Sequence, residues 1–356
     1  MDSYQRLLKT VAHQQPDRPP LELMATDRVV ERLRQHLSLA DTEELLRLLG
    51  VDFRRLDLPI DKKQPIPVSA ESRVEPGDSI EVSPYGVVLL RHPNSPQGHR
   101  IYGPLYDTED LDGFDWPTPE DVLHTATVYT EIRRHNKAGL CTLTGCDNPF
   151  KIAYFMRRYD DFLVDCLTRP DYVTELLERI AAVEFTRVEN GVRAGAHCAM
   201  IFGDFAHQQE LMISPQVFRR VLRPILEEFV FRLKAINPKV LVFLHSDGNL
   251  SSVLPDLIEC GFAAVHPIQP ECMDMAAVKQ ELGDRLTLFG GISVQSELPD
   301  SSPETIRRLV RERIDGLGQD GGLILAPTNT IIEDVPLESI LAMYEEARVG
   351  ERWLTT

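Results

Sequence analysis

A histidine and an aspartate stand two residues apart where a strongly apolar segment ends. His245 and Asp247 follow the run Val-Leu-Val-Phe-Leu at residues 240–244. Because alternate side chains of a strand lie on the same face, this spacing predicts that both side chains point in one direction. Such a pair can bind a hard or borderline metal ion, or it can act as an acid/base pair in which the aspartate orients the imidazole. Burying both groups unpaired would cost on the order of 2–7 kcal/mol each, so we expect a ligand, a metal or a partner side chain to compensate.

Further polar residues follow other apolar segments in the same way. They are Asp204, His207, Gln208, His266 and Asn329. If these segments are parallel strands of a barrel, their ends meet at one rim, and His207, His245 and His266 converge on one pocket. For His266, a side chain that is satisfied within the rim is the alternative to a catalytic role.

Eight short apolar segments can serve as the strands that position these residues. They lie at 21–24, 52–56, 140–145, 199–204, 240–245, 262–267, 286–291 and 322–327. Most are separated by longer segments with helical periodicity, and those at 169–195, 214–238 and 301–318 have a proline near their start. Strands that alternate with helices indicate a parallel sheet, and eight such units predict a closed (β/α)₈ barrel of the α/β class. A doubly wound open sheet is the alternative, but no G-x-G-x-x-G motif follows any segment, so dinucleotide binding is unsupported.

We expect the residues outside the eight strand-and-helix units to form additions to this barrel. We interpret residues 1–356 as one barrel with an N-terminal extension and an insertion at 59–120, where Pro, Asp, Ser and Gly concentrate. Within the insertion, the alternating residues of 81–93 around a Tyr-Gly centre predict a β-hairpin. The second predicted strand fits least well, because Arg54 and Arg55 are poor residues for a buried position.

The composition restricts the class of protein and its partners. With 43% hydrophobic and 26% charged residues, the chain is an ordinary globular protein. Its net charge of -17 would repel a phosphate backbone, so we expect no nucleic-acid partner. No segment approaches the roughly 20 apolar residues of a membrane span, and the start of the chain has no apolar run for export. The six cysteines include no C-x-x-C pair. From this cysteine pattern and the lack of an export segment we expect a cytoplasmic protein, and from the lack of long apolar segments we expect no membrane association.

Several segments carry the pattern of a known family. The most specific are FLHSDGN (243–249) and GGLILAPTNT (321–330), and weaker similarity lies in FGDFAHQQELMISPQ (202–216) and RLLKTVAHQQPDRPPLEL (6–23). Together these segments resemble the uroporphyrinogen decarboxylase superfamily, and within it the branch that includes the cobamide-dependent methyltransferases. The resemblance extends over nearly the whole chain. It implies a (β/α)₈ barrel, in agreement with the count of predicted strands.

The decarboxylases of this superfamily are the poorer match. They carry an Arg-rich loop after the first strand that binds the carboxylates of the substrate. Residues 23–34 (LMATDRVVERLR), which include Met24, lack that motif. The pocket tyrosine of the family corresponds to Phe155, with Tyr154 beside it, and its catalytic aspartate corresponds to Asp57. A net charge of -17 also disfavours a porphyrinogen that carries many acidic groups.

The methyltransferases of the superfamily are the better match. Those that activate a thiol bind zinc through a His-x-Cys pair and a later cysteine or histidine. His245 matches that histidine, while Asp247 and Asn329 stand where the other two ligands are expected. Other members act on methyl ethers or methylated amines, have variable ligand sets, and pass the methyl group to a separate corrinoid protein. The resemblance therefore implies a methyltransferase that acts on a small methylated substrate.

This hypothesis assigns roles to the candidate residues. Catalytic roles fall to Asp204, His207, His245 and Asp247, zinc binding to His245 and Asp247, and substrate binding to Met24, Tyr154, Phe155, Gln208, His266 and Asn329. A corrinoid protein is the expected partner, and a homodimer is compatible with the hypothesis. Two alternatives stay open: a decarboxylase of a small or porphyrinogen-type acid, and a barrel that only binds a ligand.

Overall fold

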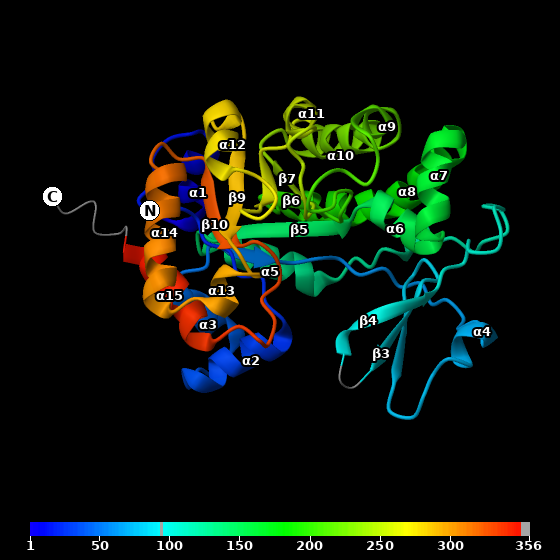
Figure 1. Ribbon diagram of the computed structural model, residues 1–356, viewed down its shortest axis with the longest axis horizontal. Coiled ribbons are helices and arrows are strands. Elements are labelled where there is room, and N and C mark those ends of the chain that lie inside the picture. The colour runs from blue at the N-terminus through cyan, green and yellow to red at the C-terminus, as the bar shows by residue number, and fades with distance from the viewer. Residues whose placement is uncertain (93–94, 350–356) are drawn as a thin grey trace.

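Seven parallel strands form the centre of the protein (Figure 1). The computed structural model describes residues 1–92 and 95–349. The strands are β1 (Phe53–Arg55), β5 (Cys141–Asp147), β6 (Cys198–Phe202), β7 (Leu241–His245), β8 (Ala264–Ile268), β9 (Thr287–Ile292) and β10 (Leu323–Pro327). Each strand pairs with the next in chain order, so the sheet runs β1-β5-β6-β7-β8-β9-β10.

The extended segment around Leu21 closes this curled sheet into a ring. The amide of Leu325 in β10 donates to the carbonyl of Pro20 (2.9 Å), and the amide of Glu22 donates to the carbonyl of Leu325 (3.2 Å). On the other side, the amide of Asp52 donates to the carbonyl of Leu21 (2.9 Å). All eight predicted segments therefore lie in one ring, and the predicted (β/α)₈ barrel of the α/β class is confirmed.

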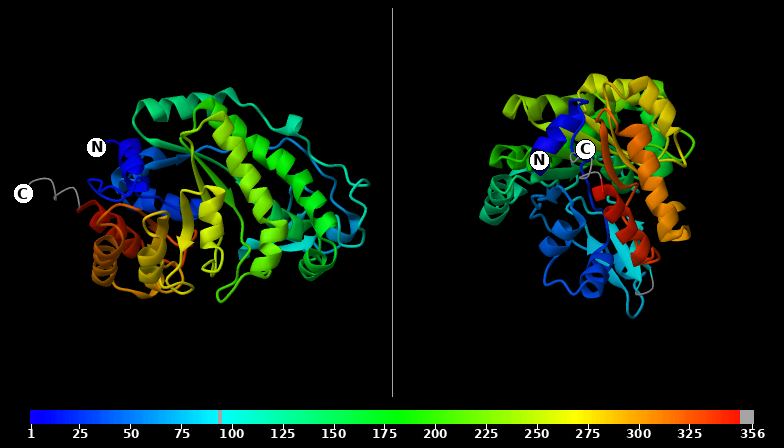
Figure 2. Two further views of the ribbon diagram at one scale, coloured as in Figure 1. Left: turned by 90° about the horizontal axis from the view of Figure 1, so that it is seen from above. Right: turned by 90° about the vertical axis from the view of Figure 1, so that its left-hand side faces the viewer.

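Most of the helices surround the ring, as the views in Figure 2 show. They are α1 (Ser3–Val11), α2 (Asp27–His36), α3 (Thr42–Leu49), α4 (Val68–Glu71), η1 (Pro119–Asp121), α5 (Ala126–Lys137), α6 (Pro149–Met156), α7 (Tyr159–Thr168), α8 (Pro170–Ala194), α9 (Pro215–Val221), α10 (Arg223–Ile236), α11 (Leu254–Cys260), α12 (Met275–Leu282), α13 (Glu297–Asp300), α14 (Pro303–Leu317) and α15 (Leu337–Arg348). The prolines predicted near the starts of helices lie there: α8 begins at Pro170. It stops before Gly195, whose φ of 107° favours glycine. Similarly, the Ser302 side chain accepts from the amide of Thr305 at the start of α14 (3.3 Å).

The helical segment expected at 214–238 consists of two helices. α9 ends at Val221 and α10 begins at Arg223. Pro224 follows directly, and proline both lacks an amide hydrogen and clashes with the carbonyl four residues earlier, so the helix is interrupted here. Within residues 1–92 and 95–349, no helix combines the length and the apolar character that a membrane span needs.

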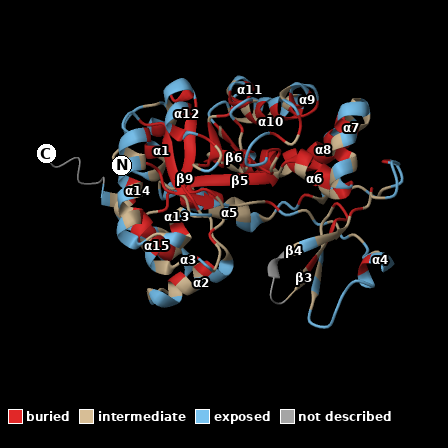
Figure 3. Ribbon diagram, viewed as in Figure 1, coloured by how far each residue is buried: buried red, intermediate tan, exposed pale blue. Residues whose placement is uncertain are grey.

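The strands of the ring consist largely of buried residues (Figure 3), and apolar side chains fill the inside of the ring and the layer between the ring and the helices. The inner group includes Phe53, Met200, Phe243 and Phe289. The rings of Phe53 and Phe289 stack with their centres 6.1 Å apart, across the ring of strands. The barrel is therefore a packed core, and space for a ligand remains at its ends.

The two arginines of β1 avoid this core in different ways. Arg54 is buried outside the ring, where its guanidinium pairs with Glu43 of α3 (2.7 Å). Arg55 lies on the opposite face at the end of the strand, and its guanidinium carbon is 3.9 Å from the centre of the Phe202 ring. Because the strand stops at Arg55, this second charge reaches the mouth of the barrel and not its packed interior.

The insertion forms a small second sheet beside the barrel (Figure 1). β2 (Ser79–Val82), β3 (Val88–His92) and β4 (Ser95–Tyr102) pair antiparallel in that order. The hairpin of β2 and β3 confirms the prediction for 81–92, and Gly86 occupies its turn with a φ of 71°. Pro93, the last residue of the predicted hairpin, lies outside the described residues. The sequence did not predict the third strand, β4.

Asp52 joins the closing segment to β1 at the amino ends of the strands. Its buried carboxylate accepts hydrogen bonds from Arg6 of α1 (2.6 Å), from Arg18 (2.7 Å) and from the amide of Leu21 (2.8 Å). Asp17 binds Arg6 from another side (2.7 Å). One buried carboxylate thus neutralises charges from two segments and also fixes the first segment of the ring against the second.

Removing Asp52 should therefore destabilise the barrel. We expect Asp52→Ala to lower the free energy of unfolding by about 3–5 kcal/mol, because the buried guanidinium of Arg18 loses this carboxylate and that of Arg6 keeps only the carboxylate of Asp17. Urea unfolding followed by circular dichroism measures this, with Asp52→Asn as a milder variant if the first does not fold. The control, Arg308→Ala, removes an exposed pair with Glu312 and should cost less than about 0.5 kcal/mol. Equal costs for the Asp52 and Arg308 variants would contradict the assignment.

Candidate active site

Asp204, His245 and Asp247 come together at the carboxyl ends of β6 and β7. His245 is the last residue of β7, and the parallel register places it beside Phe202, the last residue of β6. Nε2 of His245 lies 4.0 Å from Oδ1 of Asp204 and 3.9 Å from Oδ1 of Asp247. One donor atom from each of the three residues lies within 4.8 Å of the other two. The structure thus brings together three of the four residues that the sequence proposed as catalytic.

Hydrogen bonds fix the two loops that carry the carboxylates. The amide of Asp247 donates to Oδ1 of Asp204 (2.9 Å), and the side-chain amide of Asn329, which follows β10, donates to Oδ2 of Asp247. Gly248 has a φ of 94°, and a Cβ there would lie 2.5 Å from the carbonyl oxygen of His207. Only glycine allows the two loops to approach this closely.

A chain of hydrogen bonds from a backbone carbonyl determines which nitrogen of His245 carries the proton. Nε2 of His266 lies 3.0 Å from the carbonyl oxygen of Pro327, and because that oxygen can only accept, Nε2 must carry a hydrogen. In the neutral ring, Nδ1 of His266 then accepts, and Nδ1 of His245 donates to it across 2.7 Å. Nε2 of His245 is left with a lone pair that faces Asp204 and Asp247.

Burial sets the charges of these groups. It lowers the pKa of His245 to about 3, with a further contribution from two nearby cationic side chains. Burial also holds the pKa of His266 well below its usual value, so both imidazoles are neutral at pH 7. For Asp247, burial and the neighbouring Asp204 carboxylate together raise the pKa to about 7, against the opposing effects of the hydrogen bond from Asn329 and the charge of Lys151.

The donor atoms of this cluster fit a divalent cation. Oδ1 of Asp247 is buried and has no hydrogen-bond partner among residues 1–92 and 95–349. The lone pair of His245 and the oxygens of Asp204 and Asp247 face one another, and each is a group that zinc accepts as a ligand. Catalytic zinc sites typically use three protein ligands and keep one position open. A cation here would compensate the burial of the two carboxylates.

His266 and Asn329 contact the cluster from behind. The side chain of His266 is fully buried and bonds only to His245 and Pro327 in the described structure, while Asn329 orients Asp247. His266 and Asn329 therefore lie where they position His245 and Asp247. For His266, this agrees with the alternative stated from the sequence, in which its side chain is hydrogen-bonded within the rim and has no catalytic role.

His207 and Gln208 lie at the rim, outside the donor cluster. Nε2 of His207 lies 2.8 Å from the hydroxyl of Tyr159, and the side chain of Gln208 donates to Gln295 (3.3 Å). Both residues are exposed.

The three remaining candidates occupy different surroundings. Met24 lines a cavity in the mouth of the barrel. Tyr154 of α6 is buried, and burial together with the charge of Asp204 raises the pKa of its phenol. Phe155 lines another cavity, of about 370 Å³, which lies between α6 and the hairpin and also contains Tyr85. Only Met24 of these three lines the mouth cavity.

Two charged residues at the mouth were missed at the sequence level. Glu22 in the closing segment and Arg55 at the end of β1 both line the mouth cavity, which measures about 220 Å³. A signal was present, because Glu22 interrupts the apolar segment at 21–24 and Arg55 ends the second strand. Searching the ends of the first two strands as closely as the later ones would have found both residues.

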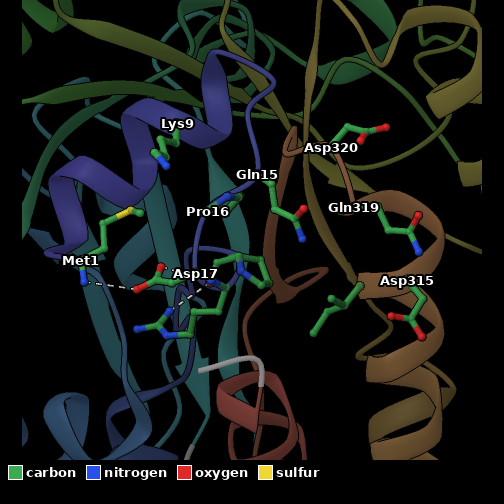
Figure 4. Close-up of a pocket in the computed structure, with 12 residues that line it drawn as sticks. Met1, Lys9, Gln15, Pro16, Asp17, Asp315, Gln319 and Asp320 are labelled. Atoms are coloured by element: carbon green, nitrogen blue, oxygen red, sulfur yellow. Dashed lines mark hydrogen bonds and ion pairs between the residues drawn. The ribbon is translucent and has the colours of Figure 1, made fainter. Parts of the chain in front are cut away.

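A larger cavity, of about 600 Å³, lies at the opposite end of the barrel (Figure 4). It is lined by residues that precede the first and last strands, at 15–19 and 318–320, and by the first helix. There the amino group of Met1 lies 3.4 Å from Asp17. Because catalytic residues of (β/α)₈ barrels sit at the carboxyl ends of the strands, the cluster around His245 is the better candidate.

The ring of strands and the donor cluster at its carboxyl end define a (β/α)₈ barrel protein with an enzyme-like site. More specifically, the chain belongs to the uroporphyrinogen decarboxylase (URO-D) family, whose sequence model matches residues 93–349. This confirms the family resemblance that the sequence motifs indicated.

The chain is similar to proteins with either of two activities. It is 26% identical over 199 residues to the methylcobamide:CoM methyltransferase MtaA of Methanosarcina barkeri, a match that covers 56% of this chain and 55% of that protein. It is 22% identical over 254 residues to the uroporphyrinogen decarboxylase of Actinobacillus pleuropneumoniae serotype 5b (strain L20), covering 68% and 69%. A solved structure of a methyltransferase from Methanosarcina mazei matches with a TM-score of 0.70 and 21% identity, over 98% of this chain and 99% of that one. This last likeness shows a shared fold, and both sequence relatives are enzymes.

The raised pKa of Asp247 should make the metal-free protein sensitive to pH. Between about pH 4 and pH 7 the folded state holds a proton on Asp247 that the unfolded state has lost, so stability falls as the pH rises through this window. Because an asparagine side chain cannot ionise, we expect Asp247→Asn to gain about 2–4 kcal/mol relative to the wild type between pH 4 and pH 8.

Urea unfolding at both pH values, with a chelator present, measures this difference. Asp284→Asn, at an exposed position, is the matched control and should show little change. If the free energies of unfolding of the wild type and Asp247→Asn differ by the same amount at pH 4 and pH 8, the pKa of Asp247 is not raised in the folded protein.

Proposed function

We propose that this protein is a methyltransferase that passes a methyl group between a small substrate and a corrinoid carried by a partner protein. The observation that carries the proposal is the neutral imidazole of His245, whose Nε2 faces two carboxylates at the mouth of the barrel. Membership of the URO-D family and similarity to a methylcobamide:CoM methyltransferase support it.

Asp204, His245 and Asp247 would hold a divalent cation such as zinc. A cation bound there supplies a Lewis acid, which stabilises the heteroatom from which a methyl group departs. The protein contributes the arrangement of the ligands: His266 keeps the proton away from Nε2 of His245, and Asn329 fixes Asp247. Such supporting contacts typically change metal affinity 10- to 100-fold. Asp204 thus adds a third ligand to the two that the sequence proposed.

The donor types favour one class of substrate. An imidazole and two carboxylates form a harder ligand set than one that contains thiolates. Hard cations prefer oxygen and nitrogen donors, so this site suits the oxygen of a methyl ether or the nitrogen of a methylated amine better than a thiol. Both groups leave poorly as anions, which explains why a cation or an acid is needed.

Asp247 could instead assist methyl transfer without a metal, by donating a proton to the leaving heteroatom. Its pKa of about 7 allows it to hold a proton near neutral pH, and the mouth of the barrel would place that proton near a leaving heteroatom. The two routes differ in whether the active protein contains a metal ion, so metal analysis distinguishes them.

The test compares the wild type with Asp204→Ala, His245→Ala and Asp247→Ala. Metal content is measured by plasma mass spectrometry, and methyl transfer is followed by the absorbance of a corrinoid protein in the presence of methyl ethers and methylated amines. We expect about one ion per chain in the wild type, loss of the ion in each variant, and a loss of turnover of at least about 100-fold.

The control is His36→Ala, which removes an exposed histidine at the end of α2 and should change neither readout. Unchanged metal content and turnover in the His245 and Asp247 variants would refute the proposal. Release of CO₂ from a carboxylic acid without any corrinoid would support the decarboxylase alternative instead.

A further inference from the structure

The mouth cavity has an apolar wall and two charged residues of opposite sign. Its lining residues are Glu22, Leu23, Met24, Ala25, Phe53, Arg55, Leu143, Met200, Phe202, Phe289 and Thr330. Glu22 and Arg55 are the charged members of this set, and no ion pair joins them in the described structure. At about 220 Å³, the cavity is smaller than the roughly 300–1,000 Å³ of pockets that hold drug-sized ligands.

This cavity shares walls with the donor cluster. The ring of Phe202 lies 5.6 Å from the ring of His245, and the ring of Phe289 lies 4.8 Å from that of His266. Thr330 directly follows Asn329, whose side chain bonds to Asp247. A small ligand in the cavity would therefore have one side next to the candidate metal ligands.

Arg55 is prepared to bind an anion. Its Nε donates to Asp57 (2.6 Å), and its guanidinium carbon lies over the ring of Phe202. These two contacts hold the group in place, but its terminal amino groups have no hydrogen-bond partner in residues 1–92 and 95–349. A guanidinium with two free amino groups matches a carboxylate, which can accept from both.

Glu22 completes the cavity as a hydrogen-bond donor. Its Oε2 is shielded from solvent and has no hydrogen-bond partner in the described structure. Burial raises the pKa of Glu22 to about 8, so at neutral pH the group is a carboxylic acid. The ionisable groups around it are Arg55, Arg54 and Asp52 on and beside β1, Tyr344 on α15 and Cys198 on β6. A protonated Glu22 can donate to an anion, whereas an ionised one would repel it.

We propose that the mouth cavity binds the carboxylate of a small substrate, which accepts hydrogen bonds from the terminal amino groups of Arg55 and from the acid form of Glu22. The aliphatic part of the substrate would lie along Phe53, Met200 and Phe289, and its methylated heteroatom would face His245. This inference rests on the proposed function, because it names the class of substrate that would bring a methyl group to the donor cluster. It selects carboxylate-bearing methyl ethers or amines over neutral ones.

The experiment measures ligand binding to the metal-free protein, residues 1–356. The probes are methoxyacetate, 3-methoxypropionate and N,N-dimethylglycine, each compared by ligand-observed NMR titration with its primary amide, which lacks the carboxylate. Removing the metal excludes binding of the carboxylate to an ion. We expect at least one acid to bind about tenfold or more tightly than its amide, since charge-assisted hydrogen bonds are worth about 1.5–3 kcal/mol.

Two variants assign this preference to the cavity. Arg55→Met keeps an unbranched side chain but removes the guanidinium, and it should abolish the preference for the acid. The control, Arg158→Met, removes an arginine that also pairs with an aspartate and lies near an aromatic ring, but outside the cavity, and should leave binding unchanged. In the wild type, affinity for the acid should fall as the pH rises through about 8, and Glu22→Gln should bind without this dependence.

The outcomes separate this inference from the proposed function. Failure of all three acids to bind, equal binding of acids and amides, or a preference that survives Arg55→Met would overturn the carboxylate site. If the acids bind as described but no methyl group reaches a corrinoid, the cavity assignment stands and the proposed function fails.

Discussion

The chemistry of the site depends on one hydrogen bond between two buried imidazoles. The carbonyl of Pro327 can only accept, so His266 must donate to it from Nε2 and accept from His245 at Nδ1. If the proton of His245 lay on Nε2 instead, that nitrogen would donate to Asp204 or Asp247 and could not bind a cation. The register of β7 and β8 places the two rings side by side, and closure of the barrel brings the end of β10 beneath them. The carbonyl oxygen of Pro327 in β10 thereby determines, through His266, which nitrogen of His245 in β7 carries the proton.

The residues that stabilise the barrel and the candidate functional residues lie at opposite ends of its strands. At the amino ends of the strands, the buried carboxylate of Asp52 fixes the closing segment, and its contacts are fully satisfied. At the carboxyl ends, Oδ1 of Asp247 and Oε2 of Glu22 are buried without partners in the described part of the chain. Unsatisfied buried groups are costly, and these two lie at the mouth of the barrel, where a ligand can supply the missing contacts. The small volume of the mouth cavity and the net charge of -17 both disfavour a large polyanionic substrate there.

The sequence predicted the ring of strands well because most of its strands are short apolar runs, although β1 contains two arginines. It also predicted that His245, Asp247 and Asp204 would lie at one rim, since parallel strands bring their carboxyl ends together, but it did not single out Asp204 as the third member of the cluster. It could not predict the pairing of His245 with His266, because which ring nitrogen meets which depends on register and side-chain rotamers. The roles of Glu22 and Arg55 were also hidden: a charge in a short apolar segment weakens a strand prediction, although at a strand end it marks the mouth of the barrel. Similarly, sequence spacing could not reveal that Phe155 lines the cavity beside the hairpin.

X-ray absorption spectroscopy of the zinc-loaded protein tests the central claim most directly, because it reports the atoms bound to the metal. The proposed ligands predict a shell of nitrogen and oxygen at about 2.0–2.2 Å, with the outer scattering of one imidazole and no sulfur. That result would agree with ligation by His245 Nε2 and two carboxylates. A sulfur shell at about 2.3 Å, or a spectrum without imidazole scattering, would contradict the account.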